Sequence, residues 1–222
     1  MHCIIGRVEG QVGLRERKKR QTREAIAETA RRLFSERGFE RVTVAQIARA
    51  ADVAEKTVFN YFPTKEDLVY WRMESFEDEI LETIRTRSPG ESVVAAFGRF
   101  VSEPRGLIAA REPEARERLE AITRMIAESP ALLAREEQIY ARYTDSLARL
   151  IAEETGAEDG EIAPWVAANA LMGIHRALVD YTRRRIVAGT RSPQLARDVR
   201  AQAKRALALL EEGLGDLARR PS

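Results

Sequence analysis

The chain has 222 residues, of which 44% are apolar, so it is long enough for one or two domains with a sizeable core. No apolar run approaches the ~20 residues of a membrane span, and no signal-peptide pattern is present, so we expect a cytoplasmic protein rather than a membrane or secreted one. The single cysteine, Cys3, excludes a disulfide framework within the chain.

The formal net charge of +2 hides an uneven distribution along the chain. Residues 1–65 contain 14 Lys and Arg against 8 Asp and Glu, whereas the remainder contains 23 against 27. A basic N-terminal part favours binding to the phosphates of nucleic acid. We expect a disordered tail over residues 1–13, a DNA-binding domain over 14–63 and a second, helical domain over 64–218.

The first predicted helix spans about residues 16–37. Its apolar side chains recur at helical spacing and form one stripe: Ile26, Ala30, Leu33 and Phe34. Gly38 is placed to end this helix in a left-handed conformation, and Phe39 can then fold back against Phe34. A basic arm precedes the stripe, with cationic side chains at Arg15, Arg17, Lys18, Lys19 and Arg20.

Two short helices joined by a tight turn are predicted next. Thr43 and Gln46 form a capping box at the start of the first, and the second spans about residues 54–61. The turn between them favours a left-handed residue, which Asp52 tolerates better than most side chains do. Burial of Val58 and Phe62 would leave an outer face made of Glu55, Lys56, Thr57, Asn60 and Tyr61.

Pro63 ends the second short helix, and Thr64 begins a further helix with Asp67 at its capping-box position. Lys65 falls in the first turn of that helix, where exposed amides also attract an anion. Two short helices behind a basic arm predict a helix–turn–helix that places one helix in the major groove of DNA. The alternative is a set of helices packed for stability alone, with a solvated charged face.

These residues resemble the TetR family of bacterial transcriptional regulators. The matching positions cover about a quarter of the chain; they are Thr22, Ala30, Phe34, Gly38, Phe39, Thr43, Ile47, Ala48, Ala51, Val53, Thr57, Phe59, Tyr61, Phe62, Lys65 and Leu68. Family members usually carry glycine where this chain has Asp52 and serine where it has Ala54. Loss of a serine N-cap costs about 1 kcal/mol of helix stability, so we expect a recognition helix that is less firmly preset.

The resemblance implies a ligand-responsive repressor that binds a palindromic operator in double-stranded DNA as a homodimer, without a cofactor. It places Lys56, Thr57, Asn60 and Tyr61 toward the groove, where asparagine can read adenine and threonine can touch a thymine methyl. The remaining expected DNA contacts are Thr43 and Gln46 on the backbone or a groove edge, Tyr61 and Lys65 on phosphate, and the basic arm along the backbone or in the minor groove.

The remainder of the chain is predicted to be helical, which makes the protein all-α with about nine to ten helices. Serine–proline pairs at Ser88, Ser129 and Ser192 place an N-cap before a first-turn proline, and Gly156 and Gly189 mark helix ends. With further starts at Pro113 and Pro164, the predicted helices span 64–87, 89–103, 105–111, 113–128, 130–155, 161–188 and 193–218.

The last two predicted helices are the expected dimer interface, because 161–188 is apolar on two sides and must be covered on both. Paired across a twofold axis, they would form a four-helix interface. The expected contacts are Val166, Ala170, Ile174, Ala177, Leu178, Tyr181, Val199, Ala203, Leu207, Leu210 and Leu214. An ordinary core within one chain is the alternative that the pattern leaves open.

Family members typically hold an effector between the middle helices, and aromatic and methionine side chains around a few polar groups suit a largely apolar ligand. The candidate lining residues are Phe97, Phe100, Met125, Ile126, Tyr140, Tyr143, Trp165, Asn169, Met172 and His175. For each of them, plain core packing is the competing interpretation.

An enzyme is not expected, because the chain shows neither metal-ligand spacing nor a nucleophile, P-loop or dinucleotide motif. The second functional hypothesis is a helical dimeric interaction module without specific DNA binding. It would hold if Asp52 and Ala54 disrupt the recognition motif.

Overall fold

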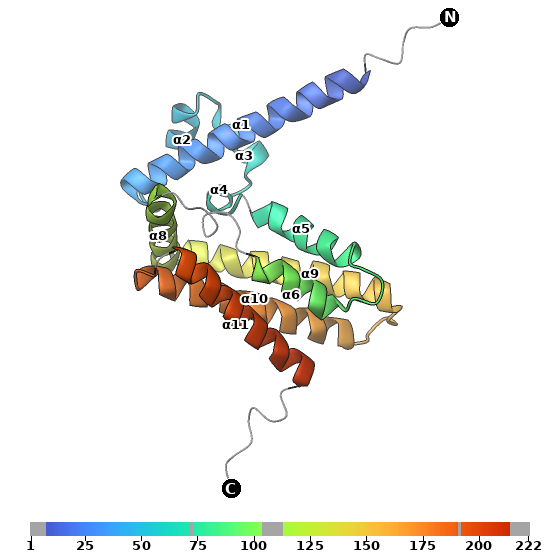
Figure 1. The fold of residues 1–222 in the computed structure, drawn as a ribbon. Helices are drawn as coiled ribbons and strands as arrows, with labels where there is room; N and C mark the ends of the chain where they lie inside the picture. Colours follow the sequence, from blue (N-terminus) through green and yellow to red (C-terminus); the bar gives the residue numbers. More distant parts are fainter. Residues whose placement is uncertain (1–7, 72, 104–112, 191, 214–222) are drawn as a thin grey trace, which may run out of the picture. The chain divides into compact units, whose positions relative to one another are not determined.

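The computed structural model describes residues 8–71, 73–103, 113–190 and 192–213 (Figure 1). All regular secondary structure in these ranges is helical, so the predicted all-α fold is confirmed. The chain divides into two compact units, the first of which ends at Trp71. This boundary falls later than the predicted residue 63, because the short helix that follows Pro63 packs against the first helix.

The N-terminal unit contains four helices: α1 (Val8–Arg37), α2 (Val44–Ala50), α3 (Glu55–Tyr61) and α4 (Asp67–Tyr70). Their buried side chains form one core, which includes Ile26, Ala30, Leu33, Phe34, Phe39, Val42, Ile47, Ala48, Val58, Phe62 and Leu68. The predicted end of the first helix is confirmed. Gly38 has a φ of 81°, its amide donates to the Phe34 carbonyl at 2.8 Å, and the Phe34 and Phe39 ring centroids lie 5.1 Å apart.

The start of α1 differs from the prediction. The helix begins at Val8, so residues 8–13, which are predicted to belong to a disordered tail, are helical. This segment contains no proline, and adding residues to an existing helix costs far less than starting one. Residues 1–7 lie outside the described ranges.

The helix predicted over 64–87 consists of two helices, α4 and α5 (Met73–Arg85). The opening turn of α4 is tightened by i to i+3 bonds, with the Leu68 amide donating to the Lys65 carbonyl at 3.2 Å and the Val69 amide to the Glu66 carbonyl at 2.9 Å. Neither glycine nor proline marks the interruption at Trp71, so the sequence pattern contains no sign of it.

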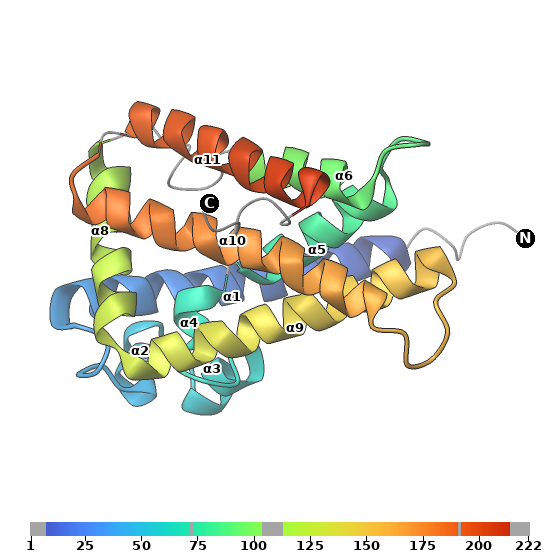
Figure 2. The ribbon, with the colours of Figure 1, turned by 90° about the horizontal axis from the view of Figure 1, so that it is seen from below.

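The C-terminal unit contains α5 and five further helices: α6 (Val93–Ser102), α8 (Pro113–Glu128), α9 (Pro130–Thr155), α10 (Ala163–Val187) and α11 (Ser192–Glu212). α9 and α10 run side by side in opposite directions, and α11 packs against α10 and α6 (Figure 2). The approach of α6 to α11 is close: a Cβ added at Gly98 would lie 2.6 Å from Leu207 Cδ1.

Most of the predicted helix boundaries in this unit are confirmed. Ser129 caps α9 through the Leu132 amide, and Gly156 ends it with a φ of 65°. The prediction at Ser88 is wrong: this residue begins a turn in which its amide donates to Glu91 Oε2 at 3.0 Å, and Ser92 caps α6 instead. The predicted helix 105–111 and the last residues of 193–218 lie outside the described ranges.

None of the helices in the described ranges is both long enough and apolar enough to cross a membrane.

The N-terminus of α3 generates a stability prediction. Ala54 has the extended N-cap conformation, with φ −71° and ψ 148°, but makes no side-chain cap bond. Ala54→Ser should therefore raise the free energy of unfolding of the N-terminal unit by about 1 kcal/mol, because the serine hydroxyl can accept a hydrogen bond from a backbone amide in the first turn of α3. Urea unfolding followed by the fluorescence of Trp71, in a Trp165→Phe background, measures this unit because the chain has two tryptophans, one in each unit.

Thr43→Ala is the matched control, since Thr43 makes the side-chain cap bond that Ala54 lacks. It should lower the free energy of unfolding by about the same amount. An unchanged midpoint for Ala54→Ser would show that the serine does not cap α3.

Candidate DNA-binding surface and effector pocket

The start of α2 is held by the predicted capping box. The Gln46 amide donates to Thr43 Oγ1 at 3.3 Å, and the Thr43 amide donates to Gln46 Oε1 at 3.0 Å. Both side chains therefore fix the helix end, and the side-chain nitrogen of Gln46 keeps two further N–H groups with which it can donate.

The turn between α2 and α3 has the predicted left-handed residue. Asp52 has a φ of 54°, and it is the one non-glycine residue with a positive φ in the described ranges. The amide of Val53 then reaches back to the Ala48 carbonyl at 3.0 Å, which closes the end of α2. Aspartate therefore takes the left-handed position that glycine usually occupies, and the hydrogen bond that closes the turn offsets the conformational cost.

α3 presents a mixed outer face. Val58 and Phe62 are buried as predicted, Lys56 and Asn60 are exposed, and Thr57 and Tyr61 are half-buried. Sequence reasoning missed Phe59, which is 47% exposed on the same short helix. Its aromatic side chain suggests burial, but position 59 is rotated by about 100° from Val58 and so lies on the flank of the core side of the helix.

Lys65 makes bonds within the domain. Its ammonium donates to the carbonyls of Phe39 at 3.1 Å and Val42 at 3.3 Å, and lies 4.0 Å from the centroid of the Phe39 ring. These bonds tie the loop between α1 and α2 to the segment before α4. Two of the three ammonium protons are used in this way, so the predicted phosphate contact would depend on the third.

The basic arm is part of α1, and its five cationic side chains are all exposed. Successive residues of a helix are rotated by about 100°, so these side chains occupy two different faces. Arg15, Lys18 and Lys19 continue the stripe that carries Thr22 and Ile26 further along α1. The other face carries Arg17 and Arg20.

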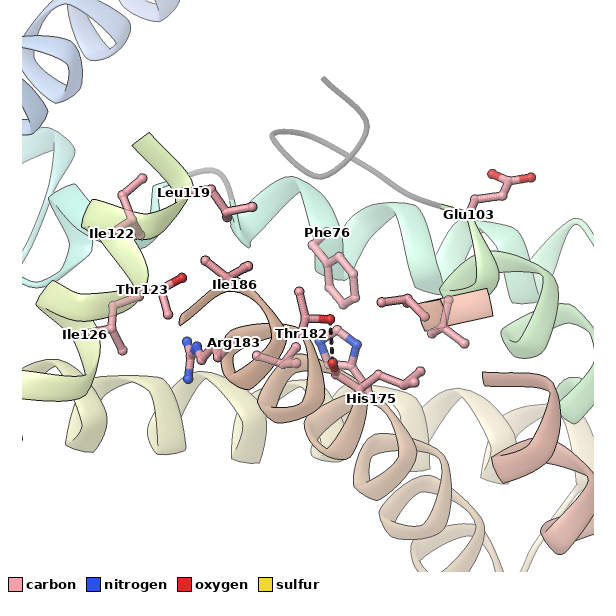
Figure 3. A pocket seen from close by; sticks show the side chains of 14 residues that line it. Phe76, Glu103, Leu119, Ile122, Thr123, Ile126, His175, Thr182, Arg183 and Ile186 are labelled. Carbon is pink, nitrogen blue, oxygen red and sulfur yellow. Dashed lines mark hydrogen bonds between the residues drawn. The ribbon is translucent and has the colours of Figure 1, made fainter. Parts of the chain in front are cut away.

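A cavity of about 260 Å³ lies in the C-terminal unit, between α5, α6, α8, α10 and α11 (Figure 3). Its lining is mostly aliphatic, with contributions from Val101, Leu119, Ile122, Ile126, Leu178, Val179, Ile186 and Val199. The aromatic and polar members of the wall are Phe76, Glu103, Thr123, His175, Thr182 and Arg183. A concave, mostly apolar site with a few polar groups is the usual form of a small-molecule pocket.

His175 lies in the aromatic part of this pocket. Its ring centroid is 4.6 Å from that of Phe76 and 5.7 Å from that of Tyr140. Burial lowers the pKa of His175 to about 4, because desolvation penalises the charged imidazolium. The imidazole is therefore neutral at neutral pH, with one N–H donor and one acceptor nitrogen.

Arg183 is held by a carboxylate beside the pocket. Its Nη1 donates to Glu136 Oε2 at 2.8 Å, and its Nη2 donates to Glu136 Oε1. Glu136 is buried on α9, whereas Arg183 on α10 retains partial exposure at the pocket wall. The bidentate pair joins the two helices and neutralises the charge of the guanidinium.

The predicted effector residues fall largely outside this pocket. His175 and Ile126 line it, whereas most of the others are packed in the core, namely Phe97, Phe100, Tyr140, Tyr143 and Met172. Met125 is half-buried off the wall, and Trp165 and Asn169 are exposed on α10. Apolar composition identifies buried residues but cannot separate a cavity wall from the core behind it.

The predicted dimer residues are also divided between two faces. Ile174, Leu178, Val199 and Ala203 are buried within the chain, and Leu207 packs against Gly98. Ala170, Tyr181 and Leu210 are half-buried, Val166 and Ala177 are exposed, and Leu214 lies outside the described ranges. The outward face of α10 also carries Trp165, 47% exposed, and the outward face of α11 carries Leu209. Helical periodicity shows two apolar stripes on α10 but not which of them its own chain covers.

Sequence profiles of known families match both units. Residues 26–70 match the profile of bacterial regulatory proteins of the tetR family, and residues 88–215 match that of the MftR C-terminal domain. The second match alone spans more than half of the chain.

Similar proteins agree with this assignment. The HTH-type transcriptional regulator TcmR of Streptomyces glaucescens is 31% identical over 68% of this chain and 69% of its own length. MftR of Mycobacterium tuberculosis, by its name a putative transcriptional regulator of mycofactocin biosynthesis, is 26% identical over 75% and 80%. The crystal structure of NalD from Pseudomonas aeruginosa shares the fold, with a TM-score of 0.52, 19% identity and coverage of 84% of this chain and 97% of its own.

The helix–turn–helix geometry, the two profile matches and the relatives agree. The chain belongs to the TetR family and is a DNA-binding transcriptional regulator.

Proposed function

We propose that this regulator is a repressor that binds a palindromic operator as a homodimer and leaves it when a small molecule occupies the pocket of the C-terminal unit. The observation that carries the proposal is the outer face of α3, where Lys56, Phe59 and Asn60 are exposed together beside a capped α2. Such a regulator acts in the cytoplasm, where bacterial DNA lies.

The side chains of α3 divide by chemistry. Asn60 suits adenine through two hydrogen bonds, Lys56 suits the acceptors of guanine, and the apolar groups of Phe59 and Thr57 suit a thymine methyl. The hydroxyl of Tyr61 is a candidate phosphate donor, as are the amide of Gln46 and the hydroxyl of Thr43. Base contacts supply specificity and phosphate contacts supply register, so α3 carries the sequence preference.

The basic arm adds affinity from the backbone side. An α-helix with its side chains is about 10–12 Å wide, whereas the minor groove of B-DNA is about 6 Å wide. A helical arm therefore lies along phosphates rather than inside the minor groove. Arg15, Lys18 and Lys19 share the face that continues toward the domain core, and we assign the phosphate contacts to this face.

The outward faces of α10 and α11 support the homodimer. Trp165 and Val166 are exposed on α10 beside the small residues Gly173 and Ala177, which permit close approach of a second helix. Two-fold pairing would cover these side chains and place two α3 helices on two operator half-sites.

The effector response is assigned to α5. Phe76 on this helix lines the pocket, and α5 begins at Met73, immediately after the short segment that follows the N-terminal unit. A ligand that displaces Phe76 acts on the helix nearest in sequence to the DNA-binding unit. Release of DNA requires that the ligand bind the released state more tightly.

Selection of bound sequences from random duplex DNA, followed by titration at several salt concentrations, tests the proposal. A palindromic consensus is expected. Lys56→Glu should weaken binding to that consensus by about 100-fold or more, because it removes a groove contact and adds repulsion. Its thermal unfolding should match that of the wild type, since Lys56 is exposed.

Lys65→Met is the informative comparison. It removes two bonds to carbonyls of the same domain, so it should lower the free energy of unfolding by about 1–3 kcal/mol. Equal losses of stability in Lys56→Glu and Lys65→Met would refute the different roles of the two lysines. Salt-sensitive binding without any consensus would reject specific readout by α3.

The two faces of the arm give a second prediction. Replacing Arg15, Lys18 and Lys19 together by glutamine should reduce the slope of log affinity against log salt by about 0.9 for each phosphate that the variant no longer neutralises. The Arg17→Gln, Arg20→Gln double variant is the control for the other face and should leave the slope unchanged. Equal changes in both variants would show that the arm is not helical on DNA.

Phe59 gives a third prediction. Phe59→Ala should reduce discrimination for thymine at one position of each half-site by about 1 kcal/mol or more, because the variant removes the aromatic ring that packs on the methyl. Comparison of thymine with uracil at that position, in wild type and variant, measures the methyl contribution. An unchanged preference in the variant would remove Phe59 from the readout.

A further inference from the structure

The pocket of the C-terminal unit is elongated. Its wall includes six residues of α10 that share one face over three turns: His175, Leu178, Val179, Thr182, Arg183 and Ile186. At 1.5 Å per residue this stripe is about 16 Å long. A cavity of about 260 Å³ drawn out along such a stripe accommodates an extended molecule better than a compact one.

The parts of the pocket differ in chemistry. Figure 3 shows Leu119, Ile122 and Ile126 of α8 at one end, Phe76 and His175 together near the middle, and Glu103 beyond them. The α8 end is mostly aliphatic, with the Thr123 hydroxyl and the Arg183 guanidinium beside it. The part around His175 offers an aromatic face and a titratable ring.

The charges at the wall do not provide a receptor for an ion. Arg183 already donates two bonds to Glu136, and an anion that took its place would leave a buried carboxylate without its partner. Leaving one member of a buried ion pair unpaired is strongly unfavourable. Glu103, the other charged residue at the wall, repels anions and is exposed, so water screens its attraction for cations.

In the aromatic part of the pocket, His175 is the polar group that a ligand can address. Its ring contacts Phe76 and Tyr140, and neither ring nitrogen has a hydrogen bond to any of the described residues. The hydroxyl of Thr182 donates to the Leu178 carbonyl at 2.7 Å, so that donor is used within α10 (Figure 3). Since the imidazole is neutral at neutral pH, it can both donate and accept.

We infer that this pocket takes an uncharged, elongated apolar ligand with one hydroxyl or carbonyl group placed against His175. The inference rests on the proposed ligand-responsive function and names the chemical class of its effector. An ionised head group of either sign is excluded from the pocket interior.

Three probes with a ten-carbon chain test the charge rule on the full-length protein: 1-decanol, decanoate and decyltrimethylammonium. Equilibrium dialysis and thermal unfolding at neutral pH, below micelle formation, should show decanol binding at least tenfold more tightly than either ion. Tighter binding of decanoate than of decanol would overturn the inference, since it would make Arg183 a receptor for the head group.

Two variants locate the ligand's polar group. His175→Phe keeps an aromatic ring beside Phe76 but removes both nitrogens, so decanol affinity should fall about tenfold, the usual cost of removing one hydrogen bond. Glu136→Gln removes the carboxylate that neutralises Arg183, so the affinity for decanoate should rise at least tenfold. Leu133→Met, at an exposed position of α9 away from the pocket wall, is the control and should change neither affinity. Unchanged decanol affinity in His175→Phe would reject the assigned hydrogen bond.

DNA binding separates this inference from the proposed function. If none of the three probes binds while the protein still binds its selected operator, the ligand class is wrong and the regulator function stands. If decanol binds through His175 but no operator is selected, the pocket chemistry stands and the proposed repressor function falls.

Discussion

The constraint on which the C-terminal unit depends is that α10 is apolar on two sides. One side packs against α9, α11 and α8 and buries Leu171, Met172 and Ile174. Near the N-terminal end of α10, Trp165 and Val166 are exposed, at 47% and 59%. These two side chains are the ones that the proposed homodimer would cover. A single helix therefore contributes to both the core and the pocket of this unit, and to the surface proposed for the homodimer.

The N-terminal unit is organised differently, by polar contacts at the ends of short helices. Helices of the length of α2 and α3 are marginal alone, so caps and tertiary bonds decide whether they form. The Thr43 capping box starts α2, Asp52 makes the left-handed turn, and Lys65 anchors two loop carbonyls. Because these bonds do not involve the outer face of α3, the side chains on that face can differ from one operator to another without a loss of stability.

The parts of the fold that could be predicted from sequence are those marked by local chemistry. Gly38, Thr43, Ser129 and Gly156 each perform the terminating or capping role that their residue type favours. The interruption at Trp71 carries no such residue, and the choice of Ser92 over Ser88 as the cap of α6 depends on a turn that competes for Glu91. The pocket lining is harder to predict from sequence than the helix ends. Phe97 and Ile126 are both apolar and buried, and only the packing of several helices decides that Ile126 lines the cavity and Phe97 does not.

Two adjacent residues of α5 have different roles: one lines the pocket and the other bonds to α9. This difference limits how a ligand could act on α5. Phe76 faces the pocket, whereas Glu77 pairs with Arg142 at 2.9 Å and accepts a bond from Ser146 at 2.7 Å, both on α9. Tyr143 of α9 also donates to the carbonyl of Met73 at the start of α5. A ligand that moves Phe76 must therefore carry these bonds along or break them, and either course costs free energy. A ligand could shift α5 only to the extent that it binds the rearranged arrangement more tightly than the present one, and that difference would have to exceed the cost of losing these bonds.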